Sequence, residues 1–160
     1  MIRKSFKKAG FSGKAALVLS TWFGAGLMPV APGTFGTLAS LPVVLFSWYL
    51  GPLFETLFLL ILILVALWAS GLSRRLIGAD DPPAVVIDEA AGFLLSLFLV
   101  PHSWVTLTTA FVLFRIFDIW KPFPIRRLEK VGGGAGIVLD DLAAGVYANL
   151  CLRIGMYFFG

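Results

Sequence analysis

The residues best suited to chemistry are acids that stand in tight groups. Seven of the nine acidic residues lie at Asp80–Asp81, Asp88–Glu89, Asp118 and Asp140–Asp141. Carboxylate oxygens, completed by water and phosphate, are the ligands that Mg²⁺ prefers in proteins. The sequence therefore predicts a shared cation site formed by Asp88, Glu89, Asp118, Asp140 and Asp141. Asp80–Asp81 precedes two prolines and is more typical of a solvated turn.

Acids of this kind also have a simpler interpretation. The dipole of a helix favours negative charge in its first turn, and Asp88 or Asp140 would then serve only to stabilise a helix start. One such acid would mean little. An unpaired carboxylate at mid-membrane costs about 2.5–3.5 kcal/mol on insertion scales, so several acids beside apolar segments favour the cation site.

Two glycine-rich segments are candidates for binding phosphate. The sequence PGTFGT at residues 32–37 brings Thr34, Gly36 and Thr37 to the start of an apolar run. Backbone N–H groups exposed at a helix start bind anions, although an ordinary glycine turn capped by threonine has the same composition. GGGAG at residues 132–136 precedes another apolar run but lacks the Lys-Ser/Thr of a P-loop, so nucleotide binding is not indicated.

A third cluster combines both signs of charge. Arg115, Asp118 and Lys121 recur at intervals of three and so share roughly one face of a helix. Pro122 and Pro124 then end that helix. A carboxylate between two cations can orient a metal while the cations hold a phosphate. The alternative is a basic cluster at the membrane surface that holds anionic headgroups.

The composition sets the class of protein that must position these side chains. Only 14% of the 160 residues are charged and the mean hydropathy is +0.93, whereas about 25% of a soluble domain is charged. The chain carries a net charge of +4, but nucleic-acid-binding proteins are polar and this chain is not. One cysteine, Cys151, excludes an internal disulfide. We expect a single all-α domain over residues 1–160, a polytopic helical bundle in a membrane.

Apolar runs give the expected spans. Two full spans are expected at 36–53 and 56–73, and a helical hairpin at 90–114 with its turn at Pro101–Ser103. A last span is expected from Ile137 to about Phe159. The segment 15–30 contains Gly24, Gly26 and Pro29, which favours a re-entrant or interfacial segment. The prediction is therefore about four full spans plus this N-terminal segment.

Positive charge predicts the orientation. The basic residues 1–14, the pair Arg74–Arg75 and the segment 121–130 mark three cytoplasmic regions. All four acid groups then fall at cytoplasmic ends of spans. His102, the one histidine, falls on the opposite side, so phosphatase chemistry based on histidine or on a zinc–histidine site is not expected.

Four segments together resemble the motif blocks of the phosphatidylglycerophosphatase A family of bacterial inner-membrane, Mg²⁺-dependent lipid phosphatases. These segments are APGTFGTLASLP (31–42), VVIDEAAG (85–92), FRIFDIWKPFPIRRLE (114–129) and GGGAGIVLDDLAAGV (132–146). They occur in the family's order. The resemblance implies hydrolysis of the terminal phosphate of phosphatidylglycerophosphate to phosphatidylglycerol and inorganic phosphate, at the cytoplasmic face.

The resemblance also implies roles for individual residues. Mg²⁺ ligands are expected at Asp88, Glu89, Asp118, Asp140 and Asp141, and Thr34 and Thr37 match the family's threonines. For the reaction itself we expect Asp88 or Asp141 as general base, Arg115 and Lys121 as phosphate-stabilising cations, and Thr34, Gly36 and Thr37 beside the phosphate. The expected partners are the lipid substrate and membrane lipid, with no nucleic acid or nucleotide.

Two other functions fit part of the pattern. Acids within a membrane commonly mark ion pathways, so a non-enzymatic carrier or channel for divalent cations is the main alternative. It is weakened because the acids gather at one face, with Glu55 as the exception. A scaffold held on anionic lipid would explain the basic loops but not the acidic pairs.

Overall fold

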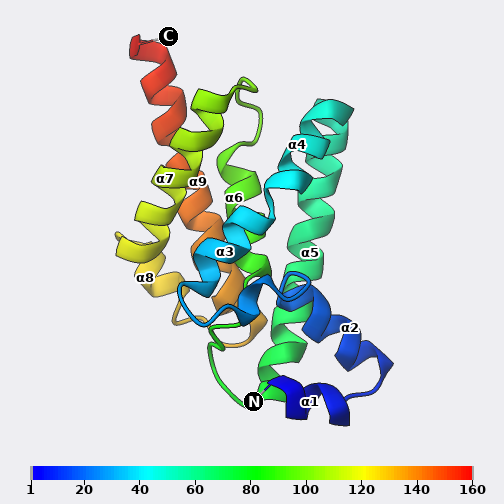
Figure 1. Ribbon diagram of the computed structural model, residues 1–160. Helices are drawn as coiled ribbons and strands as arrows, with labels where there is room; N and C mark the ends of the chain where they lie inside the picture. Colours follow the sequence, from blue (N-terminus) through cyan, green and yellow to red (C-terminus); the bar gives the residue numbers. More distant parts are fainter. Residues whose placement is uncertain (1, 160) are drawn as a thin grey trace.

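The computed structural model describes residues 2–159, and all regular structure within that range is helical (Figure 1). The predicted all-α class is therefore confirmed. The chain begins with the short basic helix α1 (Ile2–Lys8) and α2 (Phe11–Ser20), followed by a 3₁₀ turn, η1 (Ala25–Leu27). Positive φ angles at Trp22, Phe23 and Gly24 separate α2 from η1. The segment 15–30 is thus not one continuous helix, in line with the expected short N-terminal segment.

The next part of the chain contains three helices, of which the last two form an antiparallel pair. Helix α3 (Pro32–Ala39) is followed after Ser40 by α4 (Leu41–Leu50), and Gly51 with φ 89° turns the chain into α5 (Pro52–Ile77). Helix α5 continues for 26 residues because no proline follows its first residue, and Glu55 is its one charged residue before Arg74. It ends where Gly78 adopts a left-handed conformation and donates its N–H to the carbonyl of Arg74 at 2.9 Å.

The second half of the chain packs around its last helix. Helices α6 (Ile87–Ser96) and α7 (Trp104–Trp120) are joined by the turn at 97–103, and the short α8 (Ile125–Leu128) leads to α9 (Gly134–Phe159). Ser103 begins α7 by accepting the N–H of Thr106 at 3.0 Å. Helix α9 packs against α5, α6, α7 and α8 and is the centre of the bundle.

Three helical segments are long and apolar enough to cross a membrane: Pro32–Leu50, Pro52–Ile77 and Gly134–Phe158. The four full spans predicted from the sequence are not confirmed. The first helix of the expected hairpin at 90–114 is α6. Its 10 residues extend roughly 15 Å at 1.5 Å per residue, which is half the thickness of a bilayer core.

Helix α6 can end inside the bundle because α9 satisfies its last carbonyls. Asn149 donates to the carbonyl oxygens of Ser96 and Phe98 at 3.1 and 3.0 Å. Arg153 donates to the carbonyls of Phe98 and Leu99, both at 2.9 Å. A cation at a helix C-terminus is favoured by the dipole, and these bonds replace the water that an apolar surrounding cannot supply.

Glycines allow α6 and α9 to cross closely. A Cβ at Gly92 would lie 2.5 Å from the carbonyl oxygen of Asp141, and one at Gly145 would meet the carbonyl oxygen of Gly92. Small residues at such crossings let helix backbones approach each other in membrane proteins. Gly92 and Gly145 each lie one turn beyond an acid, so this crossing brings the acid-bearing turns of the two helices together.

The basic segments lie at one end of the bundle. Helix α1 contacts α5 near the N-terminus, and α8 lies on the far side of the bundle but in the same half, whereas the C-terminus lies at the other end (Figure 1). The three regions predicted to share one side of the membrane therefore lie in the same half of the fold.

Candidate functional site

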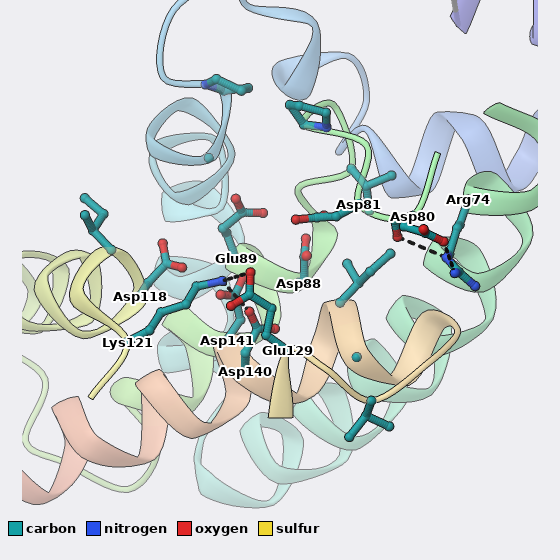
Figure 2. A pocket seen from close by; sticks show the side chains of 18 of the residues that line it. Arg74, Asp80, Asp81, Asp88, Glu89, Asp118, Lys121, Glu129, Asp140 and Asp141 are labelled. Carbon is teal, nitrogen blue, oxygen red and sulfur yellow. Dashed lines mark hydrogen bonds and ion pairs between the residues drawn. The ribbon is translucent and has the colours of Figure 1, made fainter. Parts of the chain in front are cut away.

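A pocket of about 730 Å³ opens at this same basic end. It is lined by the starts of α3, α6 and α9, the ends of α5 and α7, and the loops at 80–85 and 129–133. Eight of the nine acidic residues line it, together with four cations: Asp80, Asp81, Asp88, Glu89, Asp118, Glu129, Asp140, Asp141, Arg74, Arg115, Lys121 and Lys130. Figure 2 shows many of these side chains turned toward a common centre.

Three acids form the centre of the site. Carboxylate oxygens of Asp88, Glu89 and Asp141 all lie within 4.8 Å of one another. Asp88 and Glu89 come from the first turn of α6, and Asp141 faces them from α9 across the glycine crossing. Asp88 and Asp141 are 6% and 4% exposed, so their mutual repulsion is poorly screened by water. Such a cluster keeps its negative charge only when a positive charge lies against it.

The donor set fits Mg²⁺. Asp88 Oδ1, Glu89 Oε2 and Asp140 Oδ1 are buried and have no hydrogen-bond partner among the described residues. A buried carboxylate oxygen without a partner is costly, and a hard cation with oxygen ligands would satisfy all of these atoms. Of the five ligands predicted, the structure thus brings Asp88, Glu89 and Asp141 together, with Asp140 next to them.

The helix-start interpretation of Asp140 does not hold in the structure. Helix α9 begins at Gly134, so Asp140 and Asp141 lie in its second turn, beyond the unpaired N–H groups of the first. Asp88 and Glu89 do lie in the first turn of α6, but neither side chain caps that helix. The acids are therefore placed for one another more than for helix termini.

Asp118 is paired with Arg115 rather than placed among the three central acids. The two side chains, one turn apart on α7, form an ion pair of 2.6 Å, and both are mostly buried. This confirms the spacing argument for their shared face. The Nε of Arg115 has no hydrogen-bond partner within the described part of the chain. Arg115 thus retains a donor for an anion in the pocket.

Lys121 adopts an arrangement that its spacing did not predict. It follows the last residue of α7 with a positive φ of 47°, and its ammonium donates to Asp140 at 2.7 Å and lies 3.5 Å from Glu129 (Figure 2). Burial by itself lowers the pKa of Lys121, but the hydrogen bond to Asp140 and the surrounding acids outweigh burial and raise it. Lys121 is therefore a permanent cation at the pocket wall.

The PGTFGT segment forms the first turns of α3 rather than a loop. Ala31, Pro32 and Gly33 line the pocket, whereas Thr34, Gly36 and Thr37 do not. Thr37 is fully buried and donates its hydroxyl to the carbonyl of Gly33 at 3.0 Å. A Cβ at Gly33 would meet Glu89 Oε1 and lie 3.2 Å from Arg115 Nη1. The missing side chain therefore lets Glu89 and Arg115 pack directly against the first turn of α3.

The remaining pocket walls come from loops. Gly132, Gly133 and Gly136 of the second glycine-rich segment line the pocket, and the positive φ of Gly133, 84°, turns the chain into α9. Asp80, on the other wall, forms an ion pair with Arg74 and accepts a further hydrogen bond at its carbonyl, 3.0 Å from Arg74 Nε.

Sequence reasoning missed four residues of this pocket. Glu129 and Lys130 stand in a basic run, and Arg74 was assigned only to a basic loop. Gly33 was not singled out, because the phosphate-binding prediction for its segment rested on the threonines and on Gly36. The position of Glu129 eight residues after Lys121 gave no signal, because their contact depends on how α8 folds back toward α9.

Comparison with known proteins gives a consistent family. The sequence profile described as phosphatidylglycerophosphatase A matches residues 18–156. A phosphatidylglycerophosphatase A of Escherichia coli is 36% identical over 131 residues, covering 81% of this chain and 76% of that protein. Its counterpart in Haemophilus influenzae is 40% identical over 135 residues, covering 82% of each chain.

A third relative has a different assigned substrate. A Bacteroides thetaiotaomicron protein, named as a candidate phosphatidylinositol-3-phosphatase, is 36% identical over 153 residues, covering 90% of this chain and 95% of the relative. No solved structure matches the chain. The three relatives share a lipid phosphomonoester in their names, and they differ in the alcohol that carries it.

Proposed function

We infer the reaction from a firm premise: the chain belongs to the phosphatidylglycerophosphatase A family and is a phosphatase. We propose that it hydrolyses the terminal phosphate of phosphatidylglycerophosphate and releases phosphatidylglycerol and inorganic phosphate. The observation that carries this proposal is the meeting of Asp88, Glu89 and Asp141 within 4.8 Å, in one pocket with Arg115 and Lys121. Metal-assisted hydrolysis of a phosphomonoester uses carboxylates to hold the metal and cations to hold the phosphate.

The cations hold the phosphate in this proposal. Arg115, through its unpartnered Nε, and Lys121 donate to the non-bridging oxygens of the terminal phosphate, whose charge they offset as the P–O bond to the glycerol breaks. Gly33 lets Arg115 approach the first turn of α3 at the pocket wall. The substrate phosphate then takes the place of Glu129 as the partner of Lys121.

The acids activate water in this proposal. Asp88 or Asp141 accepts a proton from the attacking water, whose oxygen bonds to phosphorus, and the glycerol oxygen leaves with a proton from solvent. Both aspartates are buried, so counterions in bulk water do not reach the carboxylate that acts as the base. Attack by an aspartate, with hydrolysis of the resulting acyl phosphate, uses the same residues and is tested by oxygen labelling.

Mg²⁺ is the proposed cofactor. Asp88, Glu89 and Asp141 would hold it, with Asp140 beside them and Asp118 orienting Arg115. When bound, Mg²⁺ supplies positive charge that offsets the charge of the phosphate and lowers the pKa of water. The three central carboxylates are therefore expected to bind Mg²⁺ cooperatively with substrate.

The proposed location is the bacterial inner membrane, with the pocket on the cytoplasmic side. Three basic segments surround the pocket end, and positively charged segments remain in the cytoplasm. The relatives are bacterial proteins, and the apolar helices agree with an integral membrane protein. In this orientation the pocket opens where the phosphate of a membrane lipid lies.

A divalent-cation carrier receives no support from the arrangement of the acids. Within the described part of the chain, Glu55 is the one acid outside the pocket, and it lies near His102 at the opposite end of α5. An ion path requires ligands spaced through the membrane. Cation flux into proteoliposomes is the assay in which this alternative would be seen.

Phosphate release from phosphatidylglycerophosphate by purified protein in detergent, with Mg²⁺ and with EDTA, tests the proposal. We expect metal-dependent release that Asp141→Asn and Glu89→Gln abolish while the protein stays folded. Glu55→Gln is the matched control, because it removes a buried carboxylate outside the pocket, and its activity should remain. Equal release in EDTA, or near-normal activity of both pocket variants, contradicts the proposed site.

Substrate selectivity is measured with the same preparation. Phosphatidylinositol 3-phosphate is the competing substrate, because one relative is named for it. Its ring is bulkier than glycerol, and it would have to fit in the pocket lined by Gly33 of α3 and by Arg115. We expect phosphatidylglycerophosphate to have the higher kcat/KM. A preference for the inositol lipid would reassign the substrate but keep the reaction class.

A further inference from the structure

A shallow apolar groove runs along α7 and joins the pocket. It is lined by Phe111, Val112, Arg115, Ile116, Ile119 and Trp120, and encloses about 450 Å³. Arg115 and Ile119 line both the groove and the polar pocket, so the two spaces meet at these residues. An apolar channel that opens directly into a charged pocket is unusual on a soluble surface and suits an amphipathic ligand.

The groove follows from the residue spacing of α7. Phe111, Arg115 and Ile119 form one ridge at intervals of four, and Val112, Ile116 and Trp120 form the next. The opposite face, with Leu107, Ala110 and Phe114, is buried in the bundle. Val112 and Ile116 are 54% and 47% exposed, so no part of the described chain covers the groove.

We propose that this groove holds an acyl chain of the lipid substrate while the headgroup lies in the pocket. The inference rests on the proposed function, since it requires a lipid phosphate as substrate. The groove extends from Trp120, at the pocket end, to Phe111 toward the middle of the bundle, a length of roughly 15 Å for ten residues of helix. A lipid with its phosphate beside Arg115 has its chains directed the same way, into the bilayer.

Another apolar cavity also touches the pocket but is less suitable. It shares Pro32 and Pro83 with the pocket and is lined by Ile2, Met28 and Ile77. Those residues belong to α1, to the segment before α3 and to the end of α5, which lie at the basic end of the bundle (Figure 1). An acyl chain there would point away from the apolar spans. The α7 groove is the one that leads from the pocket along them.

Arg115 connects the two parts of the proposed site. Its guanidinium pairs with Asp118 at 2.6 Å inside the pocket, while the residue also lines the groove. Long cationic side chains commonly lay their methylene stems on apolar surface and keep the charge in a polar place. The same residue would thus contact both the phosphate and the first part of the chain, which aligns the headgroup with the acids.

Filling the groove tests the proposal. In Ile116→Trp the indole occupies the space of the chain, so we expect kcat/KM for a dioleoyl substrate to fall by about tenfold. With a soluble dihexanoyl substrate, too short to fill the groove, kcat/KM should stay within about twofold of the unmodified protein. Ile61→Trp is the matched control, because Ile61 is an exposed apolar residue of α5 outside the groove and pocket, and it should leave both substrates unaffected.

A second measurement does not depend on turnover. Phosphatidylglycerol with a photoreactive diazirine in one acyl chain is irradiated with the full-length protein, and the labelled residues are mapped by mass spectrometry. We expect labelling along 111–120 above that of the exposed face of α5, and its loss in Ile116→Trp. Equal labelling of α5, an unchanged dioleoyl kcat/KM, equal losses on both substrates, or α7 cross-linked to a second copy overturns the proposal.

Absence of phosphate release from both substrates by the unmodified protein would instead contradict the proposed function. The labelling result would then still decide whether a lipid chain lies in the groove.

Discussion

Replacing Gly92 by alanine tests whether the crossing of α6 and α9 sets the geometry of the acid cluster. The new Cβ would lie 2.5 Å from the carbonyl oxygen of Asp141 and 2.7 Å from Cε2 of Phe114. Ordinary van der Waals contact begins at 3.4 Å, so the helices must separate by about 0.9 Å near the site. That displacement moves Asp88 and Glu89 away from Asp141.

This change has two consequences, a loss of stability and a loss of activity, and they can be measured separately. Alanine gains about 1 kcal/mol of helix propensity over glycine, and overpacking costs about 1–3 kcal/mol, so the free energy of unfolding falls by at most about 2 kcal/mol. A displacement of about 1 Å in a catalytic constellation costs about a hundredfold in rate. We therefore expect Gly92→Ala to fold and to lose nearly all its activity.

The assay pairs phosphate release with the melting temperature in detergent. Gly155→Ala is the control on α9, because a Cβ there meets nothing within 4 Å. It should keep full activity and gain slightly in stability. Gly92→Ala with an activity within about threefold of the unmodified protein would refute the reasoning, because it would show that the acids tolerate a wider helix separation.

Three further predictions follow from single contacts. Glu129→Gln removes one of the two acids that pair with Lys121, and it should lower KM for the substrate by about twofold to fivefold with kcat unchanged. A raised KM in initial-rate kinetics would show instead that Glu129 assists binding. Arg153→Ala leaves the carbonyl of Leu99 unpaired and removes one of the two donors to the carbonyl of Phe98, so it should lower stability by about 1–3 kcal/mol in a denaturant titration, with KM unaltered. Thr37→Val removes a hydroxyl bonded within α3 and should change kcat/KM by less than about threefold, whereas a loss above tenfold would place that hydroxyl on the phosphate.

The functional end of the molecule was predictable because charge is rare in this chain. In an apolar sequence each acid group must lie at a helix end or in a polar pocket, and the basic segments indicate which ends share a side. Adjacent acids such as Asp88–Glu89 and Asp140–Asp141 consequently lie in the same pocket. This reasoning needs no knowledge of packing.

The partners of individual side chains were not predictable in this way. Lys121 lies three residues after Asp118, yet the chain leaves the helix at Lys121 and its ammonium turns to Asp140 on α9. Helix α6 is shorter than its apolar run because Asn149 and Arg153 satisfy its carbonyls from a distant part of the sequence. Contacts of this kind are set by tertiary packing, which local spacing does not encode.

The glycine segments show a similar limit. The composition of PGTFGT fits both a phosphate-binding turn and a helix start, and the structure has a helix with Pro32 in its first turn. Proline at that position is compatible with helix, since its missing N–H would be unpaired there in any case. Within this segment Gly33 lies beside the acids, and its missing side chain lets Glu89 and Arg115 pack against α3.

Helix α9 holds α6 at both of its ends, through the glycine crossing near Asp141 and through Asn149 and Arg153 at the other. Sliding or separating the two helices would break both sets of contacts, so this pair fixes the spacing of the central acids. Other walls of the pocket are formed by α3 and the segment between α5 and α6. Metal affinity and the rate of substrate entry can consequently evolve separately, the first through the α6–α9 pair and the second through those walls.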